Sequence, residues 1–350
     1  MRQVVDTLRE THHLDSEAYK ALLVCNDENF IEYLHHQARQ VADKVFGKGI
    51  FVRGLIELTN VCRNDCLYCG IRRSNSTLKR YTLTHDQVMQ CCQTGHDIGF
   101  RTFVLQGGEL PRDKAQWLVD LVADIRSCWH DSAITLSLGE WPRDVYKALH
   151  DAGADRYLLR HETHNARHYA SLHPAEMSLS NRLDCLDSLK KLGFQVGTGI
   201  MVGSPGQTVD NIVEDIEYIE RFKPQMIGLG PFVPQHNTPL GSYPAGSADM
   251  TTRLYSIFRL MFPQMLIPST TALNSIHPEG RIMGIKAGAN VVMPNLSPAE
   301  VRDDYALYDG KASTAIESAE GVAQLEEQLN TIGYQINWGR GDFNECRMTN

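Results

Sequence analysis

The sequence lacks three features that would each define a broad class of protein. No run of eighteen apolar residues occurs, so no segment is predicted to span a membrane. The stretch from Met1 to Val24 has no apolar run of the kind found in signal peptides. Basic residues are not in surplus, since the formal net charge is −8, and nucleic acid is therefore not an expected partner. We expect a cytoplasmic protein.

A regular cysteine framework is also absent. The nine cysteines are an odd number in a chain of 350 residues, which argues against the disulfide scaffold of a small secreted protein. Hydrophobic residues make up 42% of the sequence and charged residues 22%, which is typical of a globular protein. The length allows one large domain or two of average size.

The chain is organised as a helical start followed by a regular alternation. Residues 3–46 carry apolar side chains at helical spacing, and after Ile50 short apolar strands alternate with longer amphipathic helices. This rhythm predicts an α/β fold, a (βα)8 TIM barrel over residues 51–350 that includes a C-terminal closing segment. An N-terminal helical extension over residues 1–50 precedes it. The expected strands cover residues 54–59, 101–106, 133–138, 155–161, 195–202, 225–230, 265–270 and 289–294.

The inside of this barrel is predicted to be polar. A barrel strand sends alternate residues inward, and ordinary eight-stranded cores fill that face with Val, Ile and Leu. Here one face of several strands carries small or polar residues, such as Thr135 with Ser137 and Arg160 with Glu162. Because an unpaired buried polar group costs roughly 1–3 kcal/mol, this face predicts an enclosed substrate. The alternative is an offset of one residue, which would exchange the two faces of a strand.

Three cysteines follow the first expected strand directly, in "TNVCRNDCLYCGIRRSN". Cys62, Cys66 and Cys69 would therefore lie at the C-terminal mouth of the barrel, where barrel active sites are found. Structural zinc sites and conventional iron–sulfur clusters take four protein ligands. Three ligands leave one metal position open for a group that is not protein. Basic residues near the loop either offset its charge or form a solvated face: Arg63, Arg72, Arg73, Lys79 and Arg80.

The C-x-x-x-C-x-x-C spacing, with the aromatic Tyr68 before the last cysteine, resembles the radical S-adenosylmethionine (SAM) superfamily. The resemblance implies a 4Fe-4S cluster held by the three cysteines, with SAM chelating the open iron through its amino and carboxylate groups. Electron transfer from the cluster would then yield a 5′-deoxyadenosyl radical, while the protein orients the reactants and excludes water. The same resemblance implies SAM contacts from "QGGE", "SLGEW", the fourth strand and "GIMVGSPGQT", at Tyr68, Gln106, Gly107, Gly108, Glu109, Ser137, Glu140, Arg160, Glu162, Arg182 and Met201.

Stretches dispersed over most of the chain resemble one family within this superfamily. "CLYCGIRRSN", "SLGEWPRDVY", "AGADRYLLRHET", "GPFVPQHNTPL" and "AGANVVMPN" are similar to the HydE family of FeFe-hydrogenase maturases. That implies a radical attack on the sulfur of a cysteine-bound iron carbonyl cyanide complex, a precursor of the di-iron subcluster. HydG would supply this complex and HydF would receive the product. The resemblance implies substrate contacts at Thr135, Thr270, Thr271, Ala272, Met293, Tyr305 and Tyr308.

The sequence departs from that family in one respect. Some HydE proteins carry three more cysteines near the C-terminus that bind a second cluster, whereas residues 310–325 here contain none and Cys346 stands alone. A second cluster at that position is therefore not expected. The missing cysteines, and the absence of ligands for a sacrificial cluster inside the barrel, also weaken a biotin-synthase-like interpretation.

Other interpretations stay open at this point. A mutase similar to methylornithine synthase would share the barrel and would need walls for an amino-acid zwitterion. A non-catalytic protein that only stores a cluster is a third possibility, although a polar barrel interior argues against it. For single residues, Arg160 and Glu162 could instead form a structural ion pair, and Tyr305 and Tyr308 could belong to a loop that covers the core.

Overall fold

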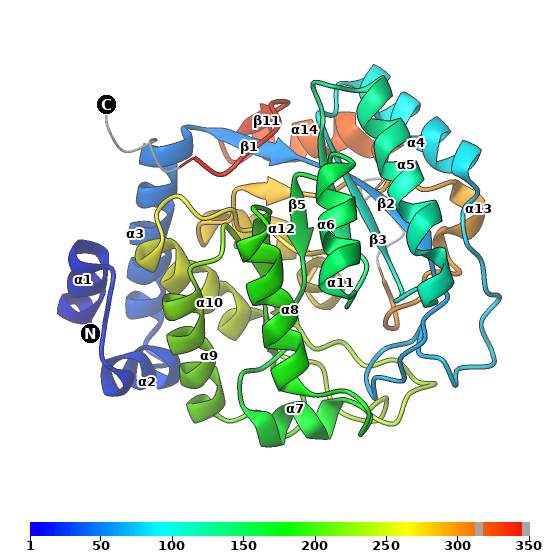
Figure 1. Cartoon of the computed structure of the whole chain (residues 1–350). Helices are drawn as coiled ribbons and strands as arrows, with labels where there is room; N and C mark the ends of the chain where they lie inside the picture. The colour runs from blue at the N-terminus through cyan, green and yellow to red at the C-terminus, as the bar shows by residue number, and fades with distance from the viewer. Residues whose placement is uncertain (312–317, 345–350) are drawn as a thin grey trace.

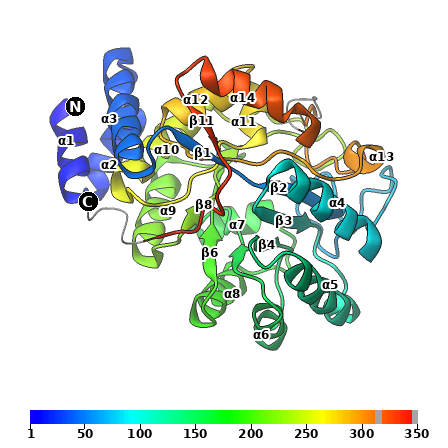
Figure 2. The same cartoon turned by 90° about the horizontal axis from the view of Figure 1, so that it is seen from above.

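The structure is a computed structural model that describes residues 1–311 and 318–344 (Figure 1). A ring of parallel strands lies at its centre with helices around the outside, as the view in Figure 2 shows. The helices are α1 (Arg2–Thr11), α2 (Ser16–Val24), α3 (Glu28–Phe46), α4 (His85–Ile98), α5 (Ala115–Cys128), α6 (Arg143–Asp151), α7 (Ala166–Leu172), α8 (Leu179–Lys191), α9 (Val209–Phe222), α10 (Ala248–Met261), α11 (Thr271–Ile276), α12 (Gly280–Lys286), α13 (Ala299–Arg302) and α14 (Val322–Asn330). The strands are β1 (Gly49–Val52), β2 (Gly54–Thr59), β3 (Thr102–Gly107), β4 (Ala133–Ser137), β5 (Arg156–Leu158), β6 (Gln195–Thr198), β7 (Met201–Val202), β8 (Met226–Ile227), β9 (Gly230–Pro231), β10 (Val291–Val292) and β11 (Gln335–Asn337).

The barrel predicted from the sequence is confirmed. Six strands form the continuous part of the ring in the order β2-β3-β4-β5-β6-β8, each parallel to its neighbours. Single bridges complete the ring by pairing Met226 with Leu266, Pro268 with Val291, and Leu55 with Asn295. The large apolar side chains of the strands face the surrounding helices, where Phe103, Leu136 and Val196 are completely buried.

Several strands are shorter than the sequence indicates. The expected seventh strand, residues 265–270, pairs only through single bridges, because Pro268 has no N–H to donate to a ladder. The expected fifth and sixth strands are each divided, into β6 with β7 and β8 with β9. They divide where two backbones meet, since a Cβ on Gly199 would lie 1.8 Å from the carbonyl oxygen of Gly228.

The N-terminal region consists of three helices that pack beside α9 and α10 (Figure 1). Asp15 and Asp27 cap α2 and α3 through their side chains, which divides a region that reads as continuously helical in sequence. On α3, the ring of His35 lies 2.8 Å from the hydroxyl of Ser256, and Arg39 donates to the carbonyl of Ile285 at 2.8 Å. These contacts fix the helical region against the far side of the barrel from the cysteine loop.

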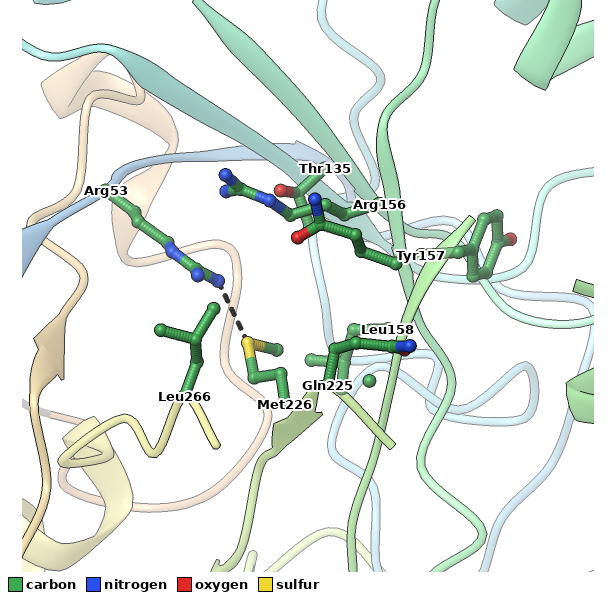
Figure 3. Close-up of a pocket in the computed structure, with 10 residues that line it drawn as sticks. Arg53, Thr135, Arg156, Tyr157, Leu158, Gln225, Met226 and Leu266 are labelled. Carbon is green, nitrogen blue, oxygen red and sulfur yellow. Dashed lines mark hydrogen bonds between the residues drawn. The ribbon is translucent and has the colours of Figure 1, made fainter. Parts of the chain in front are cut away.

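The N-terminal ends of the strands are closed by the last part of the described chain. β1 lies between β10 and β11 in a parallel three-stranded sheet, and Arg156 forms an ion pair with Asp342 at 2.5 Å. A small cavity of about 10 Å³ lies at this end. Figure 3 shows the side chains of Arg53, Thr135 and Arg156 around it. Arg53 donates to the sulfur of Met226 at 2.9 Å. This end of the barrel is therefore filled by protein.

Two further expectations from the sequence concern membrane-spanning helices and cysteines near the C-terminus. Within the described ranges, no helix combines the length and hydropathy needed to cross a bilayer. Cys346, and residues 312–317 of the stretch without a second set of cysteines, lie outside the described residues.

Candidate active site

A cavity of about 330 Å³ lies at the C-terminal ends of the strands. Its lining brings together the three cysteines of the loop and polar residues from the strand ends. Most of the residues expected to contact SAM or substrate line it: Cys62, Cys66, Tyr68, Cys69, Gln106, Gly107, Gly108, Glu109, Ser137, Arg160, Glu162, Arg182, Thr270, Thr271, Ala272, Met293, Tyr305 and Tyr308. One cavity therefore brings together the residues expected to contact SAM and those expected to contact the substrate.

The cysteine loop is held against the barrel by its own basic residues. Arg80 donates to the carbonyl oxygens of Asn60, Ile71 and Asn75 at 2.5, 2.8 and 2.9 Å, so it ties the start of the loop to its end. Arg72 is buried and lies 2.7 Å from Asp65. Both arginines hold the loop internally. The interpretation as a solvated face is therefore wrong for Arg72, whereas Arg73, whose side chain is 58% exposed, fits it.

The three thiols share a low-dielectric environment. Burial is the largest cause that raises the pKa of each thiol, to about 12 for Cys69, and the charges of the neighbouring cysteines raise the pKa of Cys66 and Cys69 further. A metal relieves this cost because a coordinating thiol is deprotonated. Among the described residues, no three His, Cys, Asp or Glu side chains converge closely enough to bind a single ion. Thiols that each bind a different iron of a cluster need not converge on one point, so the arrangement fits a cluster.

A chain of charged groups connects the loop to the strand ends. The backbone N–H of Glu109 lies 3.4 Å from the sulfur of Cys62, and its carboxylate accepts from Arg63 at 2.8 Å. On the other side Arg182 lies 3.8 Å from Glu109 and donates to Glu140 at 2.6 Å. The guanidinium of Arg182 is 9% exposed and is the centre of this network. Its position is set by the adjacent carboxylates.

Arg160 and Glu162 form the structural ion pair considered from the sequence, with Nη2 and Oε2 2.9 Å apart, and both also line the cavity. Glu162 has a positive φ of 65°, which is unfavourable for a residue with a Cβ. Its backbone is held there by hydrogen bonds to Gly199 and from Met201, at 3.0 and 3.1 Å. The surrounding strands therefore determine where the Glu162 carboxylate points.

Behind Glu162 lies a buried pair that sequence reasoning missed. His161 and Asp215 are both completely buried, with Nε2 and Oδ1 3.4 Å apart. Burial raises the pKa of Asp215 to about 8 and lowers the pKa of His161 to about 3. Both groups are therefore held close to their neutral forms, and Nδ1 of His161 lies 2.8 Å from the hydroxyl of Thr198. No motif in the sequence connects residues from these two elements.

Three expected residues lie outside the cavity lining. Thr135 lines the small cavity at the opposite end of the strands, as Figure 3 shows, because β4 runs from that end toward the mouth. Glu140 lies behind Arg182 and accepts its hydrogen bond. Met201 is buried beside Leu172 and Phe232, and its backbone carbonyl accepts from Gln207 at 2.8 Å.

Two further lining residues carry charge and were not expected from the sequence. Glu57 on β2 is completely buried, and Lys311 contacts its carboxylate. A glutamate within the apolar strand "GLIELT" is a signal that could have found the first residue. Lys311 lies 254 residues further along the chain and had no such signal.

Comparison with known proteins agrees with this geometry. Residues 56–219 match the model of the Radical SAM superfamily. This range contains the cysteine loop and the strands from β3 to β7. Together with the relative described next, this match shows that the chain belongs to the radical SAM superfamily, and it is a radical SAM enzyme.

One curated relative is the [FeFe] hydrogenase maturase subunit HydE of Thermotoga maritima. The chain is 42% identical to it over 97% of both chains. The chain is also 28% identical to the 3-methylornithine synthase of Methanosarcina barkeri, over 87% of this chain and 86% of the relative. The crystal structure of methylornithine synthase (PylB) has the same fold, with a TM-score of 0.84 and 24% identity over 95% of this chain and 97% of that one. The resemblance inferred from the sequence is confirmed.

Proposed function

We propose that this protein acts in FeFe-hydrogenase maturation, in the manner indicated by the name of the HydE subunit to which it is 42% identical. Its substrate would be a cysteine-bound iron carbonyl cyanide precursor of the di-iron subcluster. The observation that supports this best is one cavity whose lining contains the three cysteines together with Thr270, Ala272 and Met293.

Cys62, Cys66 and Cys69 would hold a 4Fe-4S cluster through three irons and leave the fourth for SAM. When bound, the cluster and SAM supply a 5′-deoxyadenosyl radical. The convergence of the three thiols on one cavity supports this assignment.

The residues of this chain orient the reactants and exclude water. Arg182, fixed by Glu140, would present its guanidinium to the carboxylate of SAM, which its planar fork matches. Glu162, locked by its backbone at positive φ, would accept from the ribose hydroxyls. Tyr68 lines the cavity beside these groups and is held from behind by His173, whose Nε2 lies 3.4 Å from its hydroxyl.

The substrate half would be formed by residues that follow the last strands: Thr270, Thr271, Ala272, Met293, Tyr305 and Tyr308. Tyr305 is buried, and its hydroxyl accepts from Gln106 at 3.4 Å. HydG would supply the iron complex and HydF would take the product. Because a reactive complex must be shielded from water, a mostly enclosed cavity suits this transfer.

The test begins with anaerobically reconstituted protein. Reduction with dithionite in the presence of SAM should release 5′-deoxyadenosine, and addition of the cysteine-bound iron complex should convert SAM into an adenosyl product attached to sulfur. An intact cluster that never cleaves SAM would instead support a protein that only stores the cluster.

A second candidate is a mutase that rearranges lysine, which the 28% identity to 3-methylornithine synthase favours. Incubation of the reduced protein with lysine and SAM separates the two functions. Formation of methylornithine would replace our proposal, whereas turnover of the iron complex without methylornithine would support it.

A further inference from the structure

Glu57 and Lys311 form an ion pair on the wall of the large cavity. Nζ of Lys311 contacts Oε1 of Glu57 and also donates to the carbonyl oxygen of Tyr305 at 3.1 Å. The ammonium group lies 4.7 Å from the centre of the Tyr305 ring. Nothing in the proposed function so far uses these two charges, although both lie inside the space that would hold the substrate.

Each partner keeps unused hydrogen-bonding capacity. An ammonium group has three donors, and among the described residues two acceptors are found for Lys311. Burial raises the pKa of Glu57, while Lys311 and, more weakly, Asn295 lower it. Asn295 is near, but Oε2 of Glu57 makes no hydrogen bond of acceptable geometry to any described residue. The unused donor of Lys311, rather than Glu57, is therefore the group that can take an anionic ligand.

The other cations of the described lining are Arg160 and Arg182, which belong to the half of the cavity assigned to SAM. Arg160 lies 2.9 Å from Glu162 and donates to the carbonyl of Ile200 at 2.8 Å. Arg182 is fixed by Glu140 and by the carbonyl of Arg160, at 2.6 and 2.7 Å. Both arginines belong to the wall on which we place SAM. Lys311 is the remaining cation, and it lies on the wall formed by β2 and the segment that follows Tyr305.

We propose that Lys311 binds the α-carboxylate of the cysteine in the iron complex, and that Glu57 holds the ammonium group in position for it. This inference rests on the proposed function and assigns a specificity-determining residue within it. A lysine suits the role because its ammonium is a compact charge whose donors rotate, so it can keep Glu57 and accept a second anion. Tyr305 restricts the ammonium further through its carbonyl and its ring.

The experiment compares two probes on the reconstituted protein with SAM bound. One probe is the iron carbonyl cyanide complex of L-cysteine, and the other is the same complex of cysteamine, which lacks the carboxylate. Their dissociation constants are measured by anaerobic titration followed by infrared spectroscopy. The variants are Lys311→Met and Glu57→Gln, with Lys147→Met as a matched control on an exposed lysine that is 63% accessible.

Lys311→Met should weaken binding of the cysteine complex by about 10- to 100-fold, the value of one charge-assisted hydrogen bond, and leave the cysteamine complex unchanged. Glu57→Gln keeps an oxygen that accepts from Lys311 and so keeps the ammonium in position, while it removes the negative charge that opposes an incoming carboxylate. The cysteine complex should therefore bind at least as tightly as before. Lys147→Met should change neither. These expectations differ from those for a purely structural ion pair. If the pair were only structural, either substitution would weaken the binding of both iron complexes.

The outcomes distinguish this inference from the proposed function. If the wild-type protein binds SAM but neither iron complex, the proposed function itself fails. If it binds the cysteine complex and Lys311→Met binds it equally well, only the role of Lys311 is overturned. Equal weakening of both probes by Lys311→Met also overturns it, because the effect would not depend on the carboxylate.

Discussion

Arg182 and Glu140 form a buried ion pair, with Nε and Oε1 2.6 Å apart, directly behind the wall of the large cavity. The pair joins α8 to the loop that follows β4, two elements whose separation in space is set by the barrel. Arg182 thereby fixes the position of Glu109 and, through the carbonyl of Arg160, of the strand that carries Glu162. One network of charges therefore connects the elements around the predicted SAM site.

Replacement of Arg182 by methionine should destabilise the protein and abolish SAM binding. Removing one partner of a buried ion pair leaves an uncompensated charge, which costs about 3–5 kcal/mol. Urea denaturation measures the free energy of unfolding, and equilibrium dialysis measures SAM binding. Arg73→Met is the matched control, because Arg73 is 58% exposed in its pair with Glu176 and an exposed pair contributes about 1 kcal/mol at most. Equal losses in the two variants would contradict the role given to Arg182.

Replacement of Cys66 by serine should prevent retention of the cluster, since two thiolates cannot hold a cluster with one open iron. Iron content should fall and 5′-deoxyadenosine formation should disappear after reconstitution. Cys128→Ser is the control, because Cys128 is exposed at the end of α5 and lies outside the cavity. A Cys66→Ser variant that still cleaves SAM at the wild-type rate would exclude this residue as a ligand.

Gly108 should not tolerate a side chain. A Cβ at this position would lie 2.3 Å from the carbonyl oxygen of Val61 and 2.7 Å from the Cβ of Cys62, so it would displace the first cysteine of the loop. Gly108→Ala should therefore lose cluster binding while the barrel still folds, as circular dichroism can show. Gly228→Ala lines the same cavity with no neighbour of its Cβ closer than 3.7 Å and should keep the cluster. Cluster retention in both variants would argue against a close contact between Gly108 and the backbone of the cysteine loop.

The stability of the protein should fall as the pH rises from 6.5 to 8. The folded protein keeps a proton on Asp215, whose pKa burial raises to about 8, whereas the unfolded chain has already released it. Below pH 6.5 this trend is opposed by His161, whose pKa burial lowers to about 3, because the unfolded chain then takes up a proton that the folded protein does not. The decrease above pH 6.5 should be about 2 kcal/mol, at about 1.4 kcal/mol per pH unit.

Urea denaturation at the two pH values measures this difference. Asp215→Asn keeps the shape of the side chain and cannot ionise, so its stability should be nearly constant over the same range. A variant with the same pH dependence as the wild type would place the titrating group elsewhere.

Much of the chemistry could be predicted because it depends on local spacing. The loop from Cys62 to Cys69 carries its ligands within eight residues, so its geometry depends little on the rest of the chain. The inward face of β3 and β4 was predicted from the alternation of strand residues, and Gln106 and Ser137 line the cavity accordingly. Thr135 follows the same alternation but lies one step lower, where the barrel is closed by the C-terminal segment. Alternation along a strand predicts whether a side chain points into the barrel. Which of the two cavities that side chain lines depends on how each end of the barrel is closed.

By itself, the sequence determined the rhythm of strands and helices, the three thiols at the first strand end and the polar interior, because periodicity and spacing act over a few residues. Only the tertiary structure decided which ionisable groups meet inside the barrel. Lys311 reaches Glu57 across 254 residues, and His161 meets Asp215 between two different elements. Such pairs are set by the closure of the ring and by the need of each buried polar group for a partner, which no local pattern records.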